Sequence, residues 1–447
     1  MRQLPEDNIN ATRRSIQIRK RRRRLVERDK KKKKKKEGKK KKMDADGIEI
    51  EEIDIVIVGA GICGLATALA LHRKGIQSVV LERSETLRTS GVAIGILTNG
   101  WRALDQLGIG SKLRQTALPL QVVRDIWLDT HKQQASPLST GEARCVKRSD
   151  LIQMLAEDLP IGTIRFGCRI VSLKLDPLTS YPILQLLDGR KVKAKVLIGC
   201  DGVNSVVAEF LKLKPKKLFP KCGFRGLTIY PNGHGRASEF VRTHGNDSVC
   251  GRIPTNENLL FWFLLVPLTD ANIFNDQELI KQMALDKTNG FPNEIAKMVE
   301  DCDTSYLSLT HLRYRTPWDV LLGRFRNGTV TVAGDAMHVM GPFLGQGGSA
   351  ALEDAIVLAR CLAQKIGVEG GVLERNGREI IQKKAGEAID AYVEERRMRL
   401  VRLSAQTYLT GLLFGTSLKP LKLLILALIV LLFGDRIRHT RYDCGRL

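Results

Sequence analysis

The order of apolar and polar positions divides the chain into segments of different periodicity. From Ile53 to about Gly110, short apolar strand patterns alternate with helical patterns. This alternation is typical of a parallel sheet with helical connections. The strand that begins at Ile53 and the strand Ser78–Leu81 enclose a helical segment, so a βαβ unit is predicted there.

The periodicity changes between residues 223 and 267. Apolar, β-rich runs such as Phe224–Tyr230 and Leu259–Pro267 are separated there by turn residues. This pattern predicts an antiparallel sheet inserted into the first fold. A short β-branched run, Thr329–Ala333, and a helix from about Gly348 to Gln364 then predict a return to the parallel sheet.

The C-terminal region is predicted to be helical and contains an unbroken apolar run from Leu423 to Phe433. This run is shorter than the roughly 20 apolar residues that span a bilayer. A longer span would have to include Lys419, Pro420 and Lys422. We therefore favour a buried or interfacial helix, and peripheral contact with a membrane stays open.

Most of the positive charge lies in an N-terminal arm. The formal net charge is +24, of which residues 1–42 carry +16. Such a block of like charge cannot form a core, so a disordered arm is expected. It could be a localisation or nucleic-acid tether, a tail without a specific role, or a leader that precedes a true start at Met43. We favour the second of these and expect no nucleic-acid partner.

The nine cysteines are scattered and include no C-x-x-C pair. This usage predicts reduced thiols in an intracellular, cytoplasmic protein. No apolar segment follows the N-terminal charges as it does in a secretory signal, so secretion is not expected. No H-E-x-x-H or Cys/His cluster is present, and no metal site is predicted.

The first motif with a chemical implication is Gly59-x-Gly61-x-x-Gly64, placed between the first strand and the following helix. In such a turn Gly59 allows the tight bend, Gly61 lets a pyrophosphate approach the backbone, and Gly64 lets the helix pack on the strand. The helix N-terminus attracts the phosphate charge. Glu82, at the end of the second strand, can accept hydrogen bonds from both ribose hydroxyls. FAD or NAD therefore fits, and NADP does not.

Two later motifs favour FAD. Asp201-Gly202 follows the strand Lys195–Ile198, and Gly334-Asp335 precedes a Gly/Pro-rich loop that leads into the helix near Gly348. Together these motifs resemble those of the para-hydroxybenzoate hydroxylase family of single-component FAD-dependent monooxygenases. The residues of these motifs are similar to those of the plant salicylate- or urate-hydroxylase-like subgroup. The resemblance covers about residues 53 to 362.

The resemblance implies a set of FAD-binding residues. Asp335 would hold a ribityl hydroxyl, Arg148 would contact FAD near its phosphates and ribityl chain, and Arg83 would add a contact at the adenosine. Asp201 would lie where FAD and the nicotinamide cofactor both influence binding. The complete predicted set is Gly59, Gly61, Gly64, Glu82, Arg83, Arg148, Asp201, Gly202, Gly334, Asp335, Gly345, Gly347 and Gly348.

The fold class implied is α/β: a Rossmann-type FAD-binding domain with a parallel sheet, an inserted, mainly antiparallel substrate domain and a helical C-terminal region. The predicted boundaries are 1–50 for the basic arm, 51–220 and 326–365 for the two parts of the FAD-binding domain, 221–325 for the substrate domain, and 366–447 for the C-terminal region with its apolar segment 423–433.

The function implied is hydroxylation of a small aromatic or heteroaromatic molecule. NAD(P)H would reduce FAD, O2 would add to give a flavin C4a-hydroperoxide, and its distal oxygen would pass to the substrate. The flavin carries the chemistry, so no catalytic side chain is predicted. The alternatives are a reductase or dehydrogenase that does not use O2, and a non-catalytic flavin-binding module tethered by the basic arm.

Two positions depart from the family pattern. An arginine is usual at the position of Ala208, and its absence puts in doubt the electrostatic interactions expected with the nicotinamide cofactor. A proline is usual at the position of Val339.

Several other residues have competing interpretations. We expect a structural role for His338 rather than a proton relay. Phe261, Trp262 and Phe263 lie in an alternating strand, so about half of them should face a core. Arg225, Arg242 and Arg252 could bind a substrate carboxylate, but we favour solvated surface positions for them.

Overall fold

The computed structural model describes residues 42–43, 49–87, 92–138, 141–268, 276–366, 378–416, 418–434 and 438–447. The chain divides into two units, residues 1–51 and residues 52–447. The first unit contributes only strand β1 (Lys42–Met43) and the beginning of β2 (Glu49–Val58). The predicted basic arm therefore lies almost wholly outside the described residues.

The first sheet is built around β2 and contains β3 (Val79–Leu81), β8 (Ile164–Arg165), β9 (Ile170–Leu175), β10 (Pro182–Leu186), β11 (Lys191–Gly199), β17 (Arg326–Asn327) and β18 (Val330–Val332). Its main strand order is β17–β18–β11–β2–β3–β8. The pairs β11–β18, β2–β3 and β3–β8 are parallel, as the alternating pattern predicted. Strands β10 and β9 extend the sheet from β11 in antiparallel pairs.

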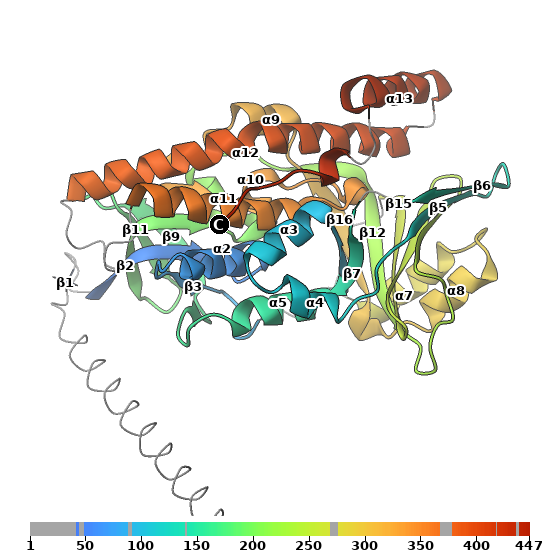
Figure 1. The fold of residues 1–447 in the computed structure, drawn as a ribbon, viewed down its shortest axis with the longest axis horizontal. Helices are drawn as coiled ribbons and strands as arrows, with labels where there is room; N and C mark the ends of the chain where they lie inside the picture. Colours follow the sequence, from blue (N-terminus) through green and yellow to red (C-terminus); the bar gives the residue numbers. More distant parts are fainter. Residues whose placement is uncertain are drawn as a thin grey trace, which may run out of the picture. The chain divides into compact units, whose positions relative to one another are not determined.

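Helices cover this sheet in layers (Figure 1). Helix α11 (Gly347–Ile366) contacts α2 (Ile62–Arg73), α3 (Thr98–Gln106) and α12 (Arg378–Gly415). The side chains of α2 from Ile62 to Leu71 are buried, because α2 packs against both α11 and strand β3 of the sheet. The other helices are α4 (Gly110–Arg114), α5 (Arg148–Glu157), α6 (Val206–Phe210), α7 (Gln277–Asp286), α8 (Asn293–Glu300), α9 (Pro317–Leu322), α10 (Asp335–His338) and α13 (Lys419–Phe433).

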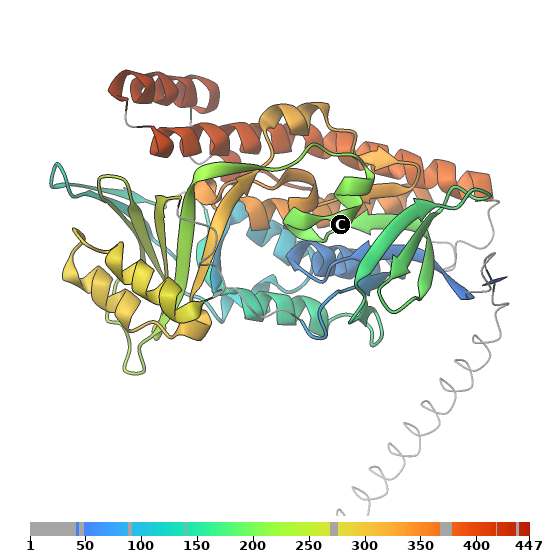
Figure 2. The ribbon, with the colours of Figure 1, turned by 180° about the vertical axis from the view of Figure 1, so that it is seen from behind.

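The second sheet contains β5 (Val122–Trp127), β6 (Lys132–Pro137), β12 (Lys217–Ile229), β13 (Glu239–His244), β14 (Val249–Asn256), β15 (Leu259–Pro267) and β16 (Ser308–Tyr314). Its order is β16–β12–β15–β14–β13–β5–β6. All neighbours are antiparallel except β13 and β5, so the expectation of a mainly antiparallel sheet is confirmed. Helices α7 and α8 cover one face of it (Figure 2). A separate two-stranded ribbon pairs β4 (Ala93–Leu97) with β7 (Ala143–Lys147).

The chain end returns to the body after α13. Arg102 Nη1 donates to the Arg441 carbonyl (2.6 Å), and the Leu447 amide donates to Gln106 Oε1 (3.0 Å). The Tyr442 ring lies beneath the guanidinium groups of Arg396 and Arg399, 5.3 and 4.6 Å from its centroid. The described helices include none that is both long enough and apolar enough to cross a bilayer.

Candidate functional site

The turn between β2 and α2 has the geometry that its glycines predicted. Gly59 has φ +97°, in the left-handed region, and a Cβ there would lie 2.7 Å from the Cys200 carbonyl oxygen. A Cβ added to Gly64 would lie 1.9 Å from the Gly59 carbonyl oxygen, so α2 sits directly on the turn. At Gly61 a Cβ would meet no heavy atom within 4 Å. The backbone at Gly61 is therefore open to a ligand, while Gly59 and Gly64 are enclosed by protein.

Glu82 lies at the end of β3, next to the glycine turn. Its side chain is buried, Oε2 accepts the Ala60 amide (2.8 Å) and Oε1 accepts the Ser84 amide (3.0 Å). These bonds hold the carboxylate beside the turn. Arg83 follows on the exposed side of the chain.

Asp201 follows β11, and its carboxylate is buried. Oδ2 accepts the Val206 amide (2.8 Å), while Oδ1 is buried without a hydrogen-bond partner in the part of the chain that the structure describes. Burial raises the pKa of Asp201, although hydrogen bonds from Ser205 and nearby amides oppose the shift. A buried carboxylate oxygen without a partner is costly, which suggests that a ligand hydroxyl or amide completes its bonding.

Asp335 is the exposed position in an otherwise buried run from β18 into α10. A Cβ added to Gly347, at the first turn of α11, would lie 4.0 Å from Asp335 Oδ1, so the carboxylate faces the start of this helix. At Gly345, φ is +62° and a Cβ would meet nothing within 4 Å. Gly348 instead packs on Ile94 of β4, where a Cβ would lie 2.4 Å from the side chain.

The structure brings these three motifs together because β18, β11 and β2 are neighbours. A Cβ added to Gly59 would approach the Asp201 Cα to 2.9 Å, and one added to Gly334 would approach Cys63 Sγ in α2 to 3.0 Å. Gly202 lies beside Asp201 with open space at its Cα. The carboxyl ends of adjacent strands in an α/β sheet form the usual ligand crevice.

Arg225, on β12, is a residue whose position the sequence analysis did not find. Burial lowers its pKa, the nearby Arg148 lowers it further, and Asp335 opposes the shift, so these three charges lie close together. Arg225 makes no hydrogen bond or ion pair with any residue that the structure describes. The surface interpretation of Arg225 was therefore wrong, because β12 turns this side chain toward Arg148 and Asp335.

The other two arginines are also not free surface residues. Arg242 Nη2 donates to Asp125 Oδ2 (2.6 Å). Arg252 forms an ion pair in which its Nη2 lies 3.7 Å from Glu294 Oε1. Both are partly buried. Their carboxylate partners come from β5 and α8, which are remote in sequence, so the composition of the strand did not reveal them.

Strand register sets the side chains that share the Arg225 face. Arg225 pairs with Phe263, Phe263 with Gly251, and Gly251 with Arg242. Directly paired residues point to the same face of a sheet. A Cβ added to Gly251 would lie 2.2 Å from the Phe263 ring, so the ring covers this glycine. Trp262 points to the opposite face, into the core with α7 and α8, as the alternation predicted.

An aromatic cluster continues from this face to the Gly/Pro-rich loop. The centroid of Phe343, in that loop, lies 5.1 Å from Phe219 and 5.9 Å from Phe414 of α12. Phe414 in turn stacks on His244 at 6.3 Å, and His244 on Trp127 at 5.2 Å. The cluster supplies flat apolar surface suited to a planar ligand.

His338 is structural, as expected. It is fully buried, and its Nε2 lies 2.6 Å from Asp354 Oδ2. The same oxygen accepts the Gly334 amide (2.9 Å), which anchors the Gly334-Asp335 turn. Asp354 and Glu353 also pair with Arg396 of α12, each at 2.7 Å. Burial raises the pKa of Asp354, but His338 and Arg396 outweigh it and lower the pKa to about 2.

Comparison with known proteins agrees with this geometry. A family model described as "FAD binding domain" matches residues 52–372. Monooxygenase 1 of Arabidopsis thaliana is 53% identical over 400 residues, which cover 89% of this chain and all of that protein. The chain belongs to this family of FAD-dependent monooxygenases. A second relative, Monooxygenase 2 of Arabidopsis thaliana, is 38% identical over 410 residues, covering 88% of this chain and 98% of the relative.

More distant relatives of the monooxygenase agree in fold. The Klebsiella pneumoniae HpxO structure, complexed with FAD and uric acid, superposes with a TM-score of 0.70 at 21% identity. The match covers 87% of this chain and 94% of that one. The FAD-dependent urate hydroxylase of Mycolicibacterium vanbaalenii is 25% identical over 68% of this chain and 78% of its own length.

The residues of the monooxygenase fit FAD. The open backbone at Gly61, the partnerless Oδ1 of Asp201 within the described residues and the open Gly202 lie at the ends of the adjacent strands β2 and β11, and they offer contacts that a dinucleotide needs. FAD binding is thus supported by the family and by a cradle formed from three strand ends.

Proposed function

We propose that the protein uses NAD(P)H and O2 to hydroxylate a small aromatic or heteroaromatic substrate that carries a negative charge. The proposal rests on one observation: the unpartnered Arg225 lies between the FAD-binding motifs and an aromatic sheet face. The uric acid bound to the Klebsiella pneumoniae protein is a planar heteroaromatic acid, which is consistent with this substrate class.

Two groups of residues would hold FAD. At the adenosine and pyrophosphate end we place Gly59, Gly61, Gly64, Glu82 and Arg83; toward the ribityl chain and ring we place Arg148, Asp201, Gly202, Gly334, Asp335, Gly345, Gly347 and Gly348. When bound, FAD supplies acceptance of the hydride and activation of O2. Helix α11 begins at Gly347, and its N-terminal dipole favours negative charge there.

The remaining work of the protein is positioning. Arg225 would pair with the substrate anion, since a partly buried guanidinium gains a charge-assisted hydrogen bond that it otherwise lacks. Phe263 and Phe343 would enclose the substrate ring and exclude water. Positioning the substrate requires no side chain to transfer a proton. The proposal therefore agrees with the sequence analysis, which predicts no catalytic side chain.

The test is turnover of the purified protein with NADH or NADPH and a panel of phenolic acids and purines. We expect substrate-dependent O2 uptake and a product that carries one oxygen atom from labelled O2. Consumption of NAD(P)H with a reduced product and no O2 uptake would identify the reductase alternative. FAD binding without any turnover across the panel would instead support the non-catalytic alternative.

Arg225→Met is expected to raise KM for anionic substrates by about tenfold to a hundredfold, the size of one hydrogen bond to a charged group. KM for uncharged analogues should change little. The control is Arg252→Met on β14, which pairs with Trp262 and points to the opposite face of the same sheet. Equal effects of the two substitutions, or equal effects on charged and uncharged substrates, would contradict the role of Arg225. FAD titration of each variant separates substrate binding from cofactor loss.

A further inference from the structure

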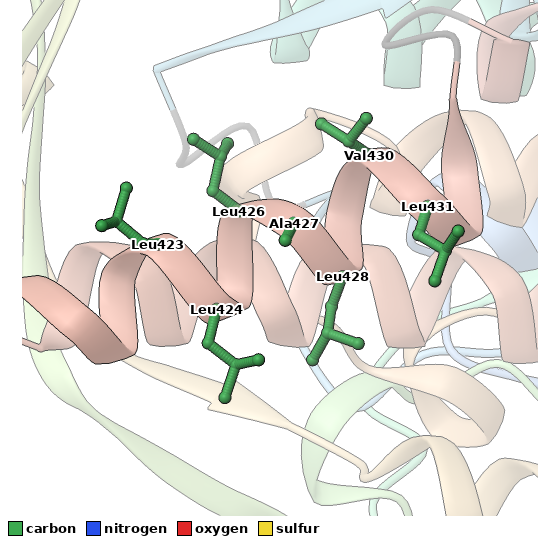
Figure 3. A pocket seen from close by; sticks show the side chains of 7 residues that line it. All are labelled: Leu423, Leu424, Leu426, Ala427, Leu428, Val430 and Leu431. Carbon is green, nitrogen blue, oxygen red and sulfur yellow. The ribbon is translucent and has the colours of Figure 1, made fainter.

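Helix α13 is an apolar element with most of its surface exposed. Its sequence from Leu423 to Phe433 contains no polar side chain. Leu423 and Leu431 are 68% and 80% exposed, whereas Ile425 is buried. Figure 3 shows the leucines and Val430 pointing in several directions around the helix axis, and a shallow surface hollow is lined by them. An exposed apolar surface of this kind usually marks an interaction site.

The distribution of the apolar side chains indicates what covers them. A partner protein or a second copy of the chain would bury one face of α13 and leave the others in water. Here the exposed apolar residues are distributed around the helix: Leu421, Leu423, Leu424, Leu426, Val430, Leu431 and Leu432. A lipid layer surrounds an inserted helix on several sides, so it matches this distribution better than a protein surface does.

The length of α13 excludes a transmembrane arrangement of this helix. Its 15 residues span about 22 Å, less than the roughly 30 Å hydrocarbon core of a bilayer. An apolar helix of this length can instead insert into the acyl chains of one leaflet, just below the headgroups, where lipid covers its several exposed faces.

Positive charge at the start of α13 matches an anionic membrane surface. From Arg396 to Gly434 the sequence contains no Asp or Glu, and Lys419 and Lys422 occupy the first turn of α13. Lys422 is exposed. Burial and the nearby Lys422 ammonium lower the pKa of Lys221 in β12, so two lysines from different elements lie close together here. Lysines of this kind extend their ammonium groups to lipid phosphates while their stems stay in apolar surroundings.

We propose that α13 is a membrane-docking helix that inserts into one leaflet of a phospholipid bilayer, just below the headgroups, with Lys422 at the anionic headgroups. Both ribbon views show α13 alongside the end of α12 (Figures 1 and 2). Gly415, at the end of α12, would bring a Cβ to within 3.6 Å of Pro220. Docking would therefore hold the region of α12 that carries Phe414 close to the lipid surface.

Vesicle flotation of the full chain tests the proposal. The N-terminal arm will itself bind anionic vesicles, but such binding is screened by salt, whereas apolar insertion is not. We therefore expect binding to phosphatidylcholine vesicles that persists at high salt, and tighter binding at low salt when phosphatidylglycerol is included. Retention of FAD shows that each protein is folded.

The decisive variant is the double substitution Leu424→Gln/Leu431→Gln, with Leu178→Gln/Leu187→Gln as the matched control. All four leucines are exposed, but the control pair lies beside β9 and β10. Loss of two inserted leucines should weaken partitioning at high salt by about tenfold or more, and the control should bind as the unaltered chain does. Equal binding of the two variants, or no binding of the unaltered chain at high salt, would overturn the proposal.

A fluorescent label reports on the helix directly. All nine native cysteines are buried, so Leu431→Cys provides an exposed thiol on α13 for an environment-sensitive dye. Vesicles should shift the dye emission to the blue. The same shift without lipid, together with a dimer in light scattering that the α13 variant abolishes, would identify a second copy of the chain as the partner and refute membrane docking.

Discussion

Arg396→Met is expected to lower the free energy of unfolding by about 3–5 kcal/mol, the usual result of removing one partner from a buried ion pair. Arg396 is fully buried and lies 2.7 Å from both Glu353 Oε2 and Asp354 Oδ1. The substitution would leave these two carboxylates side by side, with Arg399 and His338 as their remaining cationic or hydrogen-bonding partners. Urea unfolding monitored by circular dichroism measures the loss.

Arg402→Met is the matched control, because Arg402 is an exposed arginine on the same helix. It should change stability by less than about 0.5 kcal/mol. If both variants lost a similar amount of unfolding free energy, the ion pairs of Arg396 with Glu353 and Asp354 would not be the source of the effect.

The effect of Arg396→Met should depend on pH in a defined direction. Interactions with cations lower the pKa of Asp354 to about 2 and also lower that of Glu353, despite burial. Groups with a depressed folded pKa stabilise the protein above their unfolded pKa, near 4, and lose that contribution as pH falls toward the folded value. In the variant these carboxylates protonate more readily. The stability gap between the two proteins should therefore be largest at neutral pH and narrow below about pH 4.

Gly64→Ala is expected to raise the dissociation constant for FAD by about tenfold to a hundredfold, corresponding to 1–3 kcal/mol of overpacking. A Cβ at this position would lie 1.9 Å from the Gly59 carbonyl oxygen, so α2 must move away from the turn. The helix N-terminus and the turn would then no longer present their amides together. Flavin fluorescence during titration of the FAD-free protein measures the affinity.

Gly61→Ala separates a ligand effect from a folding effect. A Cβ at Gly61 meets no protein atom within 4 Å, so the thermal midpoint of the FAD-free protein should be unchanged. FAD affinity should nevertheless fall, because the methyl group would occupy the surface that a pyrophosphate approaches. Unchanged FAD affinity in Gly61→Ala would place the pyrophosphate elsewhere.

Elements formed by local patterns were predicted well from the sequence. Strand β15 spans Leu259–Pro267, as the apolar run predicted, and α11 begins within one residue of the predicted start. The glycine turn between β2 and α2 has the predicted conformation because its requirements lie within a few residues of one another. In these segments, periodicity and turn chemistry agree with the tertiary fold.

Features that depend on contacts between remote segments could not be predicted. Strand β5 pairs in parallel with β13, joining Val122 to Glu239 across more than a hundred residues. Arg225 lies near Arg148 and Asp335 only because of the way β12 packs against remote segments, and no local signal distinguishes it from Arg252. Arg396 lies in a highly charged stretch of α12 that suggests a solvated helix, yet it is buried by its pairs with Glu353 and Asp354.

The returning C-terminal segment has a mechanical consequence for α13. Helix α13 is preceded by α12 and contacts it. The segment after α13 contacts α3 through Arg441 and α12 through Tyr442. Both ends of α13 are therefore attached to the body, and the helix does not behave as a free tail. Adsorption through α13 would therefore orient the whole catalytic body relative to a bilayer.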